Sequence, residues 1–421
     1  MADQPPPDTY RDADTRKSDT SGKVADFRYK RSHQHRRPNG RDGRDRGHNS
    51  EGNRKRSPTG NADGVAHSHA AKKSPHGGPD AYAALDLGTN NCRLLIARPS
   101  GRDFTVIDAF SRVVKLGEDL ATTGRLSDDA MERTLRALSI CADKLKRRKV
   151  RLARSVATEA CRRAANGPAF IDRVRDQTGL VLDVITAEEE ARLAVLGCHI
   201  LLEDGDGPAI IFDIGGGSTE LVLVEPGGKI PRIVDWQSVP WGVVSLTDTV
   251  GRSESGKDAR IDRYARMRDI VTTSFAPFAK RIAAAAQRDD IRLLGTSGTV
   301  TTLASLHLEL PQYDRKAVDG LIVPSAAMRD ISTSLSSMSP AERSGLPCIG
   351  DDRADLVVAG CAILESIMDL WPAHRLGVAD RGIREGILRS LMAAERHSER
   401  SLRALHQLRG ENAVRGKADR T

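Results

Sequence analysis

The chain has 421 residues, of which 39% are hydrophobic, and this is enough for two or three ordinary domains with cores of their own. Its formal net charge is +8, and residues 1–80 contribute +6 of it because they hold 17 Lys and Arg against 11 Asp and Glu. No apolar segment opens the chain and nowhere do about 18 apolar residues run together, so we expect neither secretion nor a membrane span but a cytoplasmic protein.

Residues 1–80 contain hardly any large apolar side chains and are rich in Gly, Pro, Asn and charge. Such a segment cannot bury enough surface to offset its ordering entropy, so the sequence predicts a disordered basic tail. Its positive charge leaves contact with a nucleic acid open. Because no aromatic spacing or zinc pattern accompanies the charge, a solvated extension is the favoured interpretation.

The six cysteines are scattered without a CxxC pair, which favours reduced thiols used for packing over disulfides or structural zinc. The five histidines beyond residue 80 show neither HExxH nor HxH spacing. Metal binding through Cys or His is therefore not predicted.

Two stretches of the chain share one pattern, AALDLGTNNCRLLIAR at residues 83–98 and AIIFDIGGGSTELVLV at residues 209–224. Asp86 matches Asp213 and Gly88 matches Gly215. Each stretch reads as an apolar strand, an acid, a turn of small residues and a second, alternating strand, which predicts a β-hairpin. Ordinary glycine-rich hairpins are common, but finding the same acid and glycine twice favours an internal repeat with a function.

Glycine turns leave backbone N–H groups uncovered, so that several donors converge on one anion, for which phosphate is the natural guest. If each hairpin begins its own α/β domain, the two turns face each other across a cleft and a polyphosphate can bridge them. Asp86 and Asp213 are then placed to hold a hydrated divalent cation. The predicted phosphate-binding residues of the turns are Gly88, Thr89, Asn90, Gly215, Gly216, Gly217, Ser218 and Thr219.

A third loop, IRLLGTSGTVTTLASL at residues 291–306, joins an apolar strand to a helix. Hydroxyl residues at a helix N-terminus combine side-chain donors with oriented amides and favour an anion, although helix capping explains such a loop equally well. As the third loop of the set it adds Gly295, Thr296, Ser297 and Gly298 to the predicted phosphate ligands. The P-loop pattern GxxxxGKS/T is absent from the sequence, which argues against a P-loop NTPase.

Six motifs occur in the order typical of one family: LDLGTNNCRLLIA, VATEACRR, ITAEEEARL, FDIGGGSTELVLV, LGTSGTVTTL and VADRGIREGIL. Over about residues 81–395 the chain resembles the exopolyphosphatase and guanosine pentaphosphate phosphohydrolase family (Ppx/GppA). The resemblance implies an α/β fold of two actin-like, ribonuclease H-like domains with the active site in the cleft between them. It further implies hydrolysis of a terminal phosphoanhydride of inorganic polyphosphate or of pppGpp with Mg²⁺. Because the chain ends soon after the last motif, it resembles the short form of the family, and residues 1–80 lie outside the pattern.

The resemblance also assigns site residues. Glu190 matches the glutamate of the EEEAR motif and is expected to be the catalytic base, while Glu220 closes GGGSTE and is expected to bind water or cation. Arg93, at the position of the first hairpin equivalent to Glu220, resembles a phosphate ligand, as does Arg384, for which a helix-surface role is equally open. Thr158 and Glu159 suit simple helix capping and are left out of the site.

The expected domains follow from these motifs: a first actin-like domain at 81–193, a second at 194–379, a closing helix at 380–396 that packs back toward the first domain, and a polar tail at 397–421. The basic cluster KLKRRKVRLAR at residues 144–154 is explained by the C-terminal end of a helix, with guidance of a polyanion as the alternative.

Two further functions stay open at this point. The chain is either the hydrolase, a sensor that binds ppGpp or polyphosphate without turnover, or an actin-like ATP-dependent kinase. The presence of both Glu190 and Glu220 favours the enzyme over the sensor. A homodimer is compatible with the sequence but is not indicated by any pattern in it.

Overall fold

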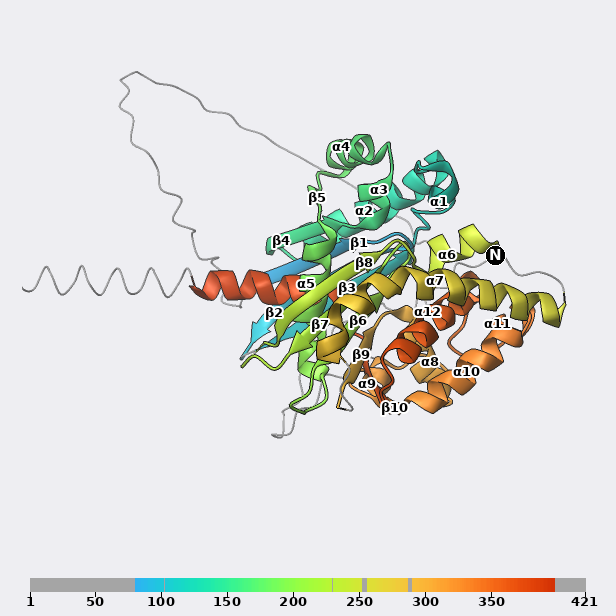
Figure 1. Ribbon diagram of the computed structural model, residues 1–421. Helices are drawn as coiled ribbons and strands as arrows, with labels where there is room; N and C mark the ends of the chain where they lie inside the picture. Colours follow the sequence, from blue (N-terminus) through green and yellow to red (C-terminus); the bar gives the residue numbers. More distant parts are fainter. Residues whose placement is uncertain (1–79, 102, 229, 252–255, 287–289, 398–421) are drawn as a thin grey trace, which may run out of the picture. The chain divides into compact units, whose positions relative to one another are not determined.

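The computed structural model describes residues 80–101, 103–228, 230–251, 256–286 and 290–397. Except for Asp80 and His397, the predicted tails at 1–80 and 397–421 lie outside the described residues. The described part contains two β-sheets with helices packed on their faces (Figure 1), so the predicted α/β class is confirmed.

The first sheet has the strand order β3-β2-β1-β4-β5. Strands β1 and β2 pair antiparallel, as do β2 and β3, whereas β4 runs parallel to both β1 and β5. The elements of this part are β1 (Ala81–Leu87), β2 (Asn91–Ser100), β3 (Asp103–Val113), α1 (Leu120–Thr123), α2 (Asp128–Arg147), β4 (Val150–Ala157), α3 (Glu159–Arg163), α4 (Gly167–Thr178), β5 (Leu182–Val184) and α5 (Ala187–Cys198).

The second sheet has the order β10-β11-β9-β6-β7-β8. Its elements and those packed around it are the 3-10 turn His199–Leu201, β6 (Ala209–Ile214), β7 (Thr219–Glu225), β8 (Arg232–Val239), α6 (Val243–Val250), α7 (Lys257–Ala286), β9 (Arg292–Thr296), α8 (Gly298–His307), α9 (Arg315–Val318), β10 (Ile322–Pro324), α10 (Ser325–Ser337), α11 (Pro340–Ser344), the 3-10 turn Asp351–Arg353, α12 (Leu356–Leu370) and β11 (Arg375–Ala379). A last helix covers residues 383–397.

The internal repeat extends beyond the two hairpins to whole sheets. In the second sheet β6 and β7 pair antiparallel, β7 and β8 pair antiparallel, and β6, β9 and β11 run parallel, which reproduces the arrangement of β1 to β5. Within the hairpins Asp86 stands opposite Arg93, and Asp213 stands opposite Glu220. The predicted equivalence of the two halves is therefore confirmed, and β10 is the strand that the second half adds.

The strand β1 shows how the first sheet is buried on both faces. Alternate side chains point to opposite sides of a strand. Leu85 and Leu87 belong to a core with α2 and α4, whereas Tyr82 and Ala84 belong to a core with α5 and the helix 383–397. This is why β1 is an almost continuous apolar run.

Helix α5 contributes to the cores of both sheets. Its Leu193 and Ala194 pack with β1 and β2, while Ala191 and Val195 pack with β6 and β7. The helix 383–397 comes equally close, because a Cβ added at Gly386 would lie 2.0 Å from the carbonyl oxygen of Leu193. Glycine is thus required where these helices meet, and the packing fixes the first turn of α5 between the two hairpins.

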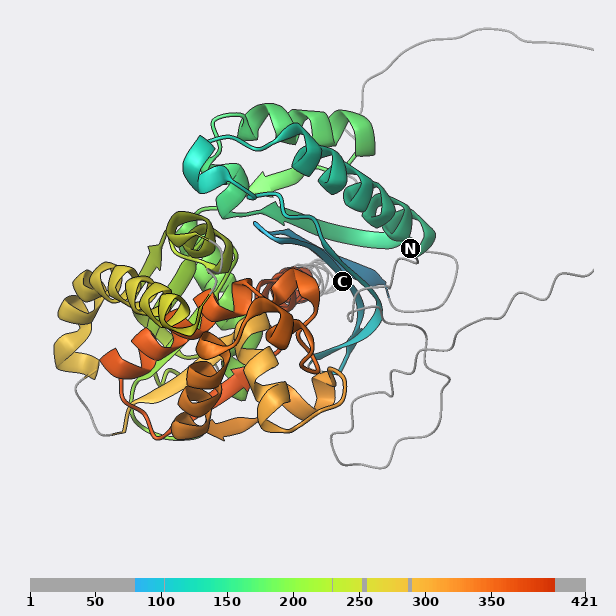
Figure 2. The same ribbon diagram turned by 90° about the vertical axis from the view of Figure 1, so that its right-hand side faces the viewer.

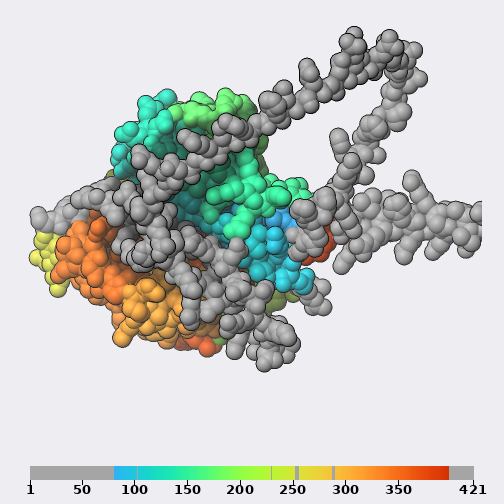
Figure 3. All heavy atoms as spheres, turned by 180° about the vertical axis from the view of Figure 1, so that it is seen from behind, coloured from blue at the N-terminus to red at the C-terminus, as the bar shows by residue number. Residues whose placement is uncertain are grey.

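The opposite face of the second sheet is covered by α7, α8, α10 and α12, whose apolar side chains form the largest core of the described residues. Figure 2 shows these helices gathered on one side of that sheet. In the view of Figure 3, atoms from the first sheet and its helices (blue to green) and from the orange part of the chain both reach the surface. Among the described helices, none has the length and apolarity to cross a membrane.

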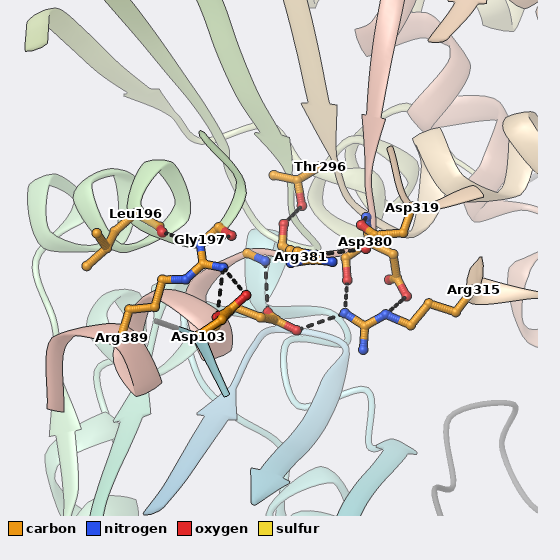
Figure 4. Close-up of polar contacts among 11 residues, drawn as sticks. Asp103, Leu196, Gly197, Thr296, Arg315, Asp319, Asp380, Arg381 and Arg389 are labelled. Carbon is orange, nitrogen blue, oxygen red and sulfur yellow. Dashed lines mark hydrogen bonds and ion pairs between the residues drawn. The ribbon is translucent and has the colours of Figure 1, made fainter. Parts of the chain in front are cut away.

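A polar network holds the segment between β11 and the helix 383–397 (Figure 4). Arg315 pairs with Asp380 and with Glu385, at 3.0 Å in each case, and Glu385 also accepts a hydrogen bond from the N–H of Gly382. Arg381 donates to Asp319 at 2.7 Å. The loop before the helix 383–397 and the first turn of that helix, which carries Arg384, are therefore tied on one side to α9 and its neighbours.

On the other side of this loop, Arg389 donates to the carbonyl oxygens of Leu196 and Gly197 at the end of α5, at 3.1 Å each, and reaches Asp103 of β3. Thr296 at the end of β9 donates to the carbonyl of Arg381 at 2.8 Å. The network thus joins elements of both sheets through one short segment.

Replacing Glu385 by Gln is expected to destabilise the fold in a pH-dependent way. Burial alone would raise the pKa of Glu385, but the positive charges of Arg384 and Arg315 outweigh it and lower the pKa to about 2. A carboxyl with a lowered pKa contributes stability above its unfolded pKa and loses it as the pH falls toward the folded value. Denaturant unfolding should show a deficit for E385Q of up to about 3 kcal/mol at neutral pH that shrinks between about pH 5 and pH 2.

The matched control is Glu132→Gln, because Glu132 forms an exposed ion pair with Arg173. Exposed pairs contribute little, so this variant should stay within about 1 kcal/mol of the unchanged protein at every pH. An E385Q deficit that does not depend on pH would contradict the assignment of a charged, buried Glu385.

Candidate functional site

A cavity of about 150 Å³ lies where the turns of the two hairpins meet. Its walls come from the β1–β2 turn, the β6–β7 turn, the start of α3, the first turn of α5 and the start of α8. Below, this cavity is called the reaction pocket. The lining residues that carry the argument are Asp86, Gly88, Thr89, Asn90, Arg93, Thr158, Glu159, Glu190, Asp213, Gly215, Gly216, Gly217, Ser218, Glu220, Ser297 and Gly298.

The two turns have the same geometry. The N–H of Gly88 donates to the carbonyl of Asn91 at 3.0 Å, and the N–H of Gly215 donates to the carbonyl of Ser218 at 2.9 Å. The carbonyl oxygen of Asn90 accepts a hydrogen bond from the N–H of Val114, directly after β3. In the same way, the carbonyl oxygen of Gly216 accepts one from the N–H of Val244, in the segment that follows β8. Within the described residues, the N–H groups of Gly216 and Gly217 have no hydrogen-bond partner, so these donors are available to a bound anion.

Glycine is needed in the second turn because the first turn lies against it. A Cβ added at Gly216 would lie 3.0 Å from the Cβ of Thr89, and one at Gly217 would lie 2.7 Å from the Thr89 hydroxyl oxygen and 2.4 Å from Oε2 of Glu159. Side chains at these positions would fill the space between the two hairpins and displace the groups that line it.

The acids near the ends of β1 and β6, Asp86 and Asp213, are half-buried. Burial raises the pKa of Asp86, and the charges of Arg384 and Arg93 oppose this rise. Burial, with the nearby charges of Glu220 and Asp86, raises the pKa of Asp213 to about 8. The Oδ1 atom of Asp86 is buried and has no hydrogen-bond partner among the described residues. Arginine charges thus offset part of the cost of burial, but no hydrogen bond within the described residues does so for either carboxyl group.

Glu190 is placed by the start of α5. Thr186 caps this helix by accepting the N–H of Glu189, which leaves Glu190 in the first turn, 6% exposed, where the helix dipole favours an acid. Its Oε2 accepts hydrogen bonds from both terminal nitrogens of Arg162 at 3.2 Å. Burial, followed by the charge of Glu220, raises the pKa of Glu190 well above its usual range.

Glu220 is the cross-strand neighbour of Asp213 on β7 and is 2% exposed. Its Oε1 accepts hydrogen bonds from the hydroxyls of Ser218 at 2.7 Å and of Ser238 at 2.9 Å. Burial raises the pKa of Glu220, and these hydroxyls work against the rise. The two hydroxyls fix the carboxyl group in one orientation at the wall of the pocket.

Most of the predicted site residues meet at the reaction pocket, but four of the predicted phosphate ligands do not line it, namely Gly295, Thr219, Thr296 and Arg384. Gly295 lies in β9, where a Cβ would lie 2.6 Å from the ring of Phe212, so close packing accounts for this glycine. Thr219 donates its hydroxyl to the carbonyl of Trp241 at 2.7 Å, and Thr296 donates to Arg381 as described above. The structure therefore gives Gly295, Thr219 and Thr296 packing and hydrogen-bonding roles. Arg384 lines a second, adjoining cavity.

Among the residues that the structure brings to this site and that sequence reasoning left out, four have polar side chains next to the proposed catalytic acids or in the wall beside them. Thr158 and Glu159 line the pocket, where burial raises the pKa of Glu159. Arg162 holds Glu190, and Ser238 holds Glu220. The motif VATEACRR contained the signal for the first three, since its polar residues open a short helix directly after β4. Ser238 lies on β8 and had no signal of its own.

The basic cluster at residues 144–154 does not line either cavity. Lys144 and Arg148 pair with Asp108 at 2.6 Å and 2.8 Å, and Arg151 pairs with Asp80. These ion pairs support the simpler interpretation of the cluster as the C-terminal end of α2 followed by β4.

A divalent cation would suit the acids of the reaction pocket. Within the described residues, no three Asp, Glu, His or Cys side chains are close enough to form a complete metal site by themselves. Mg²⁺ is usually held by one or two carboxylates together with water and substrate phosphates, so a full set of protein ligands is not required. The unpartnered Oδ1 of Asp86 and the carboxyl group of Asp213, whose pKa is raised, fit such a cation.

The Ppx/GppA phosphatase family model matches residues 95–395. Exopolyphosphatase 2 of Mycobacterium tuberculosis is 30% identical over 322 residues, covering 73% of this chain and 98% of the relative. A crystal structure of the Aquifex aeolicus member of the Ppx/GppA family has 30% identity and a TM-score of 0.62, covering 75% of this chain and 98% of its own.

An exopolyphosphatase from Cytophaga hutchinsonii shares the fold, with a TM-score of 0.66 at 23% identity, covering 75% of this chain and 98% of its own. The two sheets, their common topology and the pocket between their hairpins therefore correspond to the actin-like fold of these proteins. The family match extends over most of the described residues and includes the second hairpin. The chain belongs to the Ppx/GppA phosphatase family.

Proposed function

We propose that the chain hydrolyses the terminal phosphoanhydride bond of inorganic polyphosphate, of pppGpp or of both. The observation that carries this proposal is the meeting of two glycine-rich turns with the carboxyl groups of Asp86, Glu190, Asp213 and Glu220 at one pocket, where Glu190 and Glu220 are buried. The turns offer N–H donors to phosphate oxygens, and the carboxyl groups offer a base and a cation site. The similarity to exopolyphosphatase 2 supports polyphosphate as a substrate.

In this proposal the terminal phosphoryl group lies against the turn N–H groups of Gly216 and Gly217. Hydrolysis of a phosphoanhydride needs a water molecule in line with the leaving oxygen and stabilisation of the negative charge on the transferred group. Arg93 lines the pocket, and its Nε is buried without a partner among the described residues. Its planar guanidinium is suited to phosphate oxygens.

Glu190 is the proposed general base. Its Oε2 is held by Arg162, while its Oε1 has no hydrogen bond among the described residues and is available to a water molecule. Its raised pKa favours proton uptake, which a base must accomplish as the water attacks. The proton removed from the water passes to the Glu190 carboxylate, and the bridging oxygen leaves with the shortened chain.

Glu220 is proposed to orient the water or a hydrated cation. Ser218 and Ser238 hold its Oε1, which leaves Oε2 for a ligand. Asp86 and Asp213 would hold Mg²⁺, which supplies positive charge next to the phosphate oxygens when it is bound. The cytoplasmic location and a homodimer stay predictions.

Replacing Glu190 or Glu220 by Gln is expected to reduce turnover by about a hundredfold to ten-thousandfold, because the amide cannot accept the proton or orient the water as a carboxylate does. Phosphate release from long polyphosphate, tripolyphosphate, pppGpp and ATP at matched concentration measures this effect. Glu188→Gln is the matched control, since Glu188 is exposed on the same turn of α5. Near-normal turnover in E190Q or E220Q would reject the role of that residue.

The same assay separates the hydrolase from the other functions. Tight binding of polyphosphate or ppGpp without turnover by the unchanged protein would instead establish a sensor. Transfer of phosphate from ATP to an acceptor hydroxyl would establish a kinase.

Removing divalent cations is expected to abolish turnover, and Mg²⁺ is expected to restore it. The replacement Asp213→Asn should raise the Mg²⁺ concentration for half-maximal activity by about tenfold or more, because a carboxylate ligand is lost. Titration of phosphate release with Mg²⁺ measures the shift, with the exposed Asp206→Asn as control. Full activity in the presence of a chelator would contradict a cation at Asp86 and Asp213.

A further inference from the structure

A second, much larger cavity adjoins the reaction pocket. It encloses about 1070 Å³ and shares Asp86, Arg93, Asp213 and Ser297 with the smaller one. It extends from these residues to β3, to α2 and to the loop before the helix 383–397. Below, this space is called the outer cavity.

The two cavities differ in volume and therefore in the size of the group that each can hold. The reaction pocket, at about 150 Å³, suits a small group such as one phosphoryl with its water, whereas sites for whole ligands commonly enclose about 300–1000 Å³. If the terminal phosphoryl group occupies the reaction pocket, the rest of the substrate extends past the residues that line both spaces. It therefore extends into the outer cavity, which begins at those residues.

The outer cavity is rich in arginine. Seven of the described arginines line it, and several have protein partners. Arg133 donates to Glu118 and to the carbonyls of Val114 and Lys115, and Arg381 donates to Asp319. The guanidinium groups of Arg133 and Arg381 are thus already used in ion pairs or hydrogen bonds within the protein.

Arg112 and Arg136 differ from these. Both are exposed, and neither has an ion pair or a side-chain hydrogen bond within the described residues. Arg112 is the second-last residue of β3, and Arg136 lies on α2 one turn after Arg133. Two guanidinium groups from different elements are thus available to an anion in the outer cavity.

The acids at the far end of the outer cavity do not neutralise these two arginines. Asp352 pairs with Lys115 at 2.6 Å, and Asp380 pairs with Arg315 at 3.0 Å. Asp351 also lines the cavity and is exposed. The two paired acids leave the charge of Arg112 and Arg136 uncompensated.

We propose that the outer cavity binds the distal phosphates of a linear polyphosphate, with Arg112 and Arg136 as phosphate ligands. The inference rests on the proposed function, because it assigns the part of the same substrate that lies behind the reacting phosphoryl group. Arginine forks suit phosphate oxygens, and a polyphosphate offers charge at every unit along its length. The two residues set chain-length preference and take no part in the chemical step.

Phe110, which lines the outer cavity together with the aromatic residue Tyr313, is not open to a nucleobase. The guanidinium of Arg112 lies over the ring of Phe110, 5.6 Å from the ring centre, and Phe110 is 6% exposed. A base that stacked on this ring would have to displace the guanidinium. Phe110 therefore holds the guanidinium group of Arg112, which can contact a phosphate, and its ring is not free to stack with a base.

The test compares the double variant Arg112→Ser/Arg136→Ser with the unchanged protein. KM for long-chain polyphosphate is expected to rise about tenfold, since two charge-assisted contacts are lost, while kcat stays the same. KM for tripolyphosphate is expected to stay within about twofold, because so short a chain does not need the distal contacts. The dependence of KM on salt concentration should become weaker for long chains only.

The matched control is the double variant Arg98→Ser/Arg125→Ser, which removes the same charge from exposed arginines of the same half of the chain that line neither cavity. It should leave every parameter unchanged, and thermal unfolding should show that both double variants fold.

Three outcomes would overturn the inference. They are an unchanged KM for long polyphosphate, an equal rise for tripolyphosphate, or a rise confined to pppGpp, which would assign the outer cavity to a nucleotide. Absence of hydrolysis by the unchanged protein with all substrates would instead defeat the proposed function. In that case, binding of long polyphosphate measured directly on the unchanged protein and on the double variant still tests the two arginines, and equal affinities would overturn their assignment.

Discussion

The structure depends on the burial of acidic side chains at one small pocket. Asp86, Glu190, Asp213 and Glu220 are brought together from β1, α5, β6 and β7, and burial raises the pKa of each. Charged carboxylates so close together, with few compensating partners, are unfavourable in a protein interior. The protein contributes Arg162, Ser218 and Ser238 as partners, and these reduce the cost only in part. The remaining imbalance is what a cation and a phosphate group with its own donors can correct, so the pocket is organised around a ligand.

Packing around α5 makes this gathering of acids possible. The helix contributes apolar side chains to the cores of both sheets, and its end is held by Arg389. Its start therefore has a fixed position relative to both hairpins. The start of the helix 383–397, which carries Arg384, and the loop before it are held in turn by α9 and β9. Small changes in these contacts would alter the distances between groups that must act on one phosphoryl group.

The sequence was sufficient to predict the hairpins, because an acid, a glycine and an alternating strand have local signatures that occur here twice. It also indicated the two aspartates and the turn residues, since their chemistry follows from the turn itself. Glu190 and Glu220 required the family resemblance, because neither spacing nor composition shows that the start of α5 faces β7. Ser238 and the free state of Arg112 and Arg136 are properties of tertiary contact and carry no local signal. Gly295 shows the converse, since a glycine that looked like part of a phosphate loop packs against Phe212.

The most direct test of the account is the fate of the oxygen atom of the attacking water. The full chain with Mg²⁺ would be given long polyphosphate in water enriched with a heavy oxygen isotope, and the released orthophosphate would be analysed by mass spectrometry. Attack on the terminal phosphorus predicts one heavy oxygen atom in each released orthophosphate and none in the shortened chain. Label in the chain instead, or phosphoryl transfer to an acceptor without label, would contradict the proposed hydrolysis at this pocket.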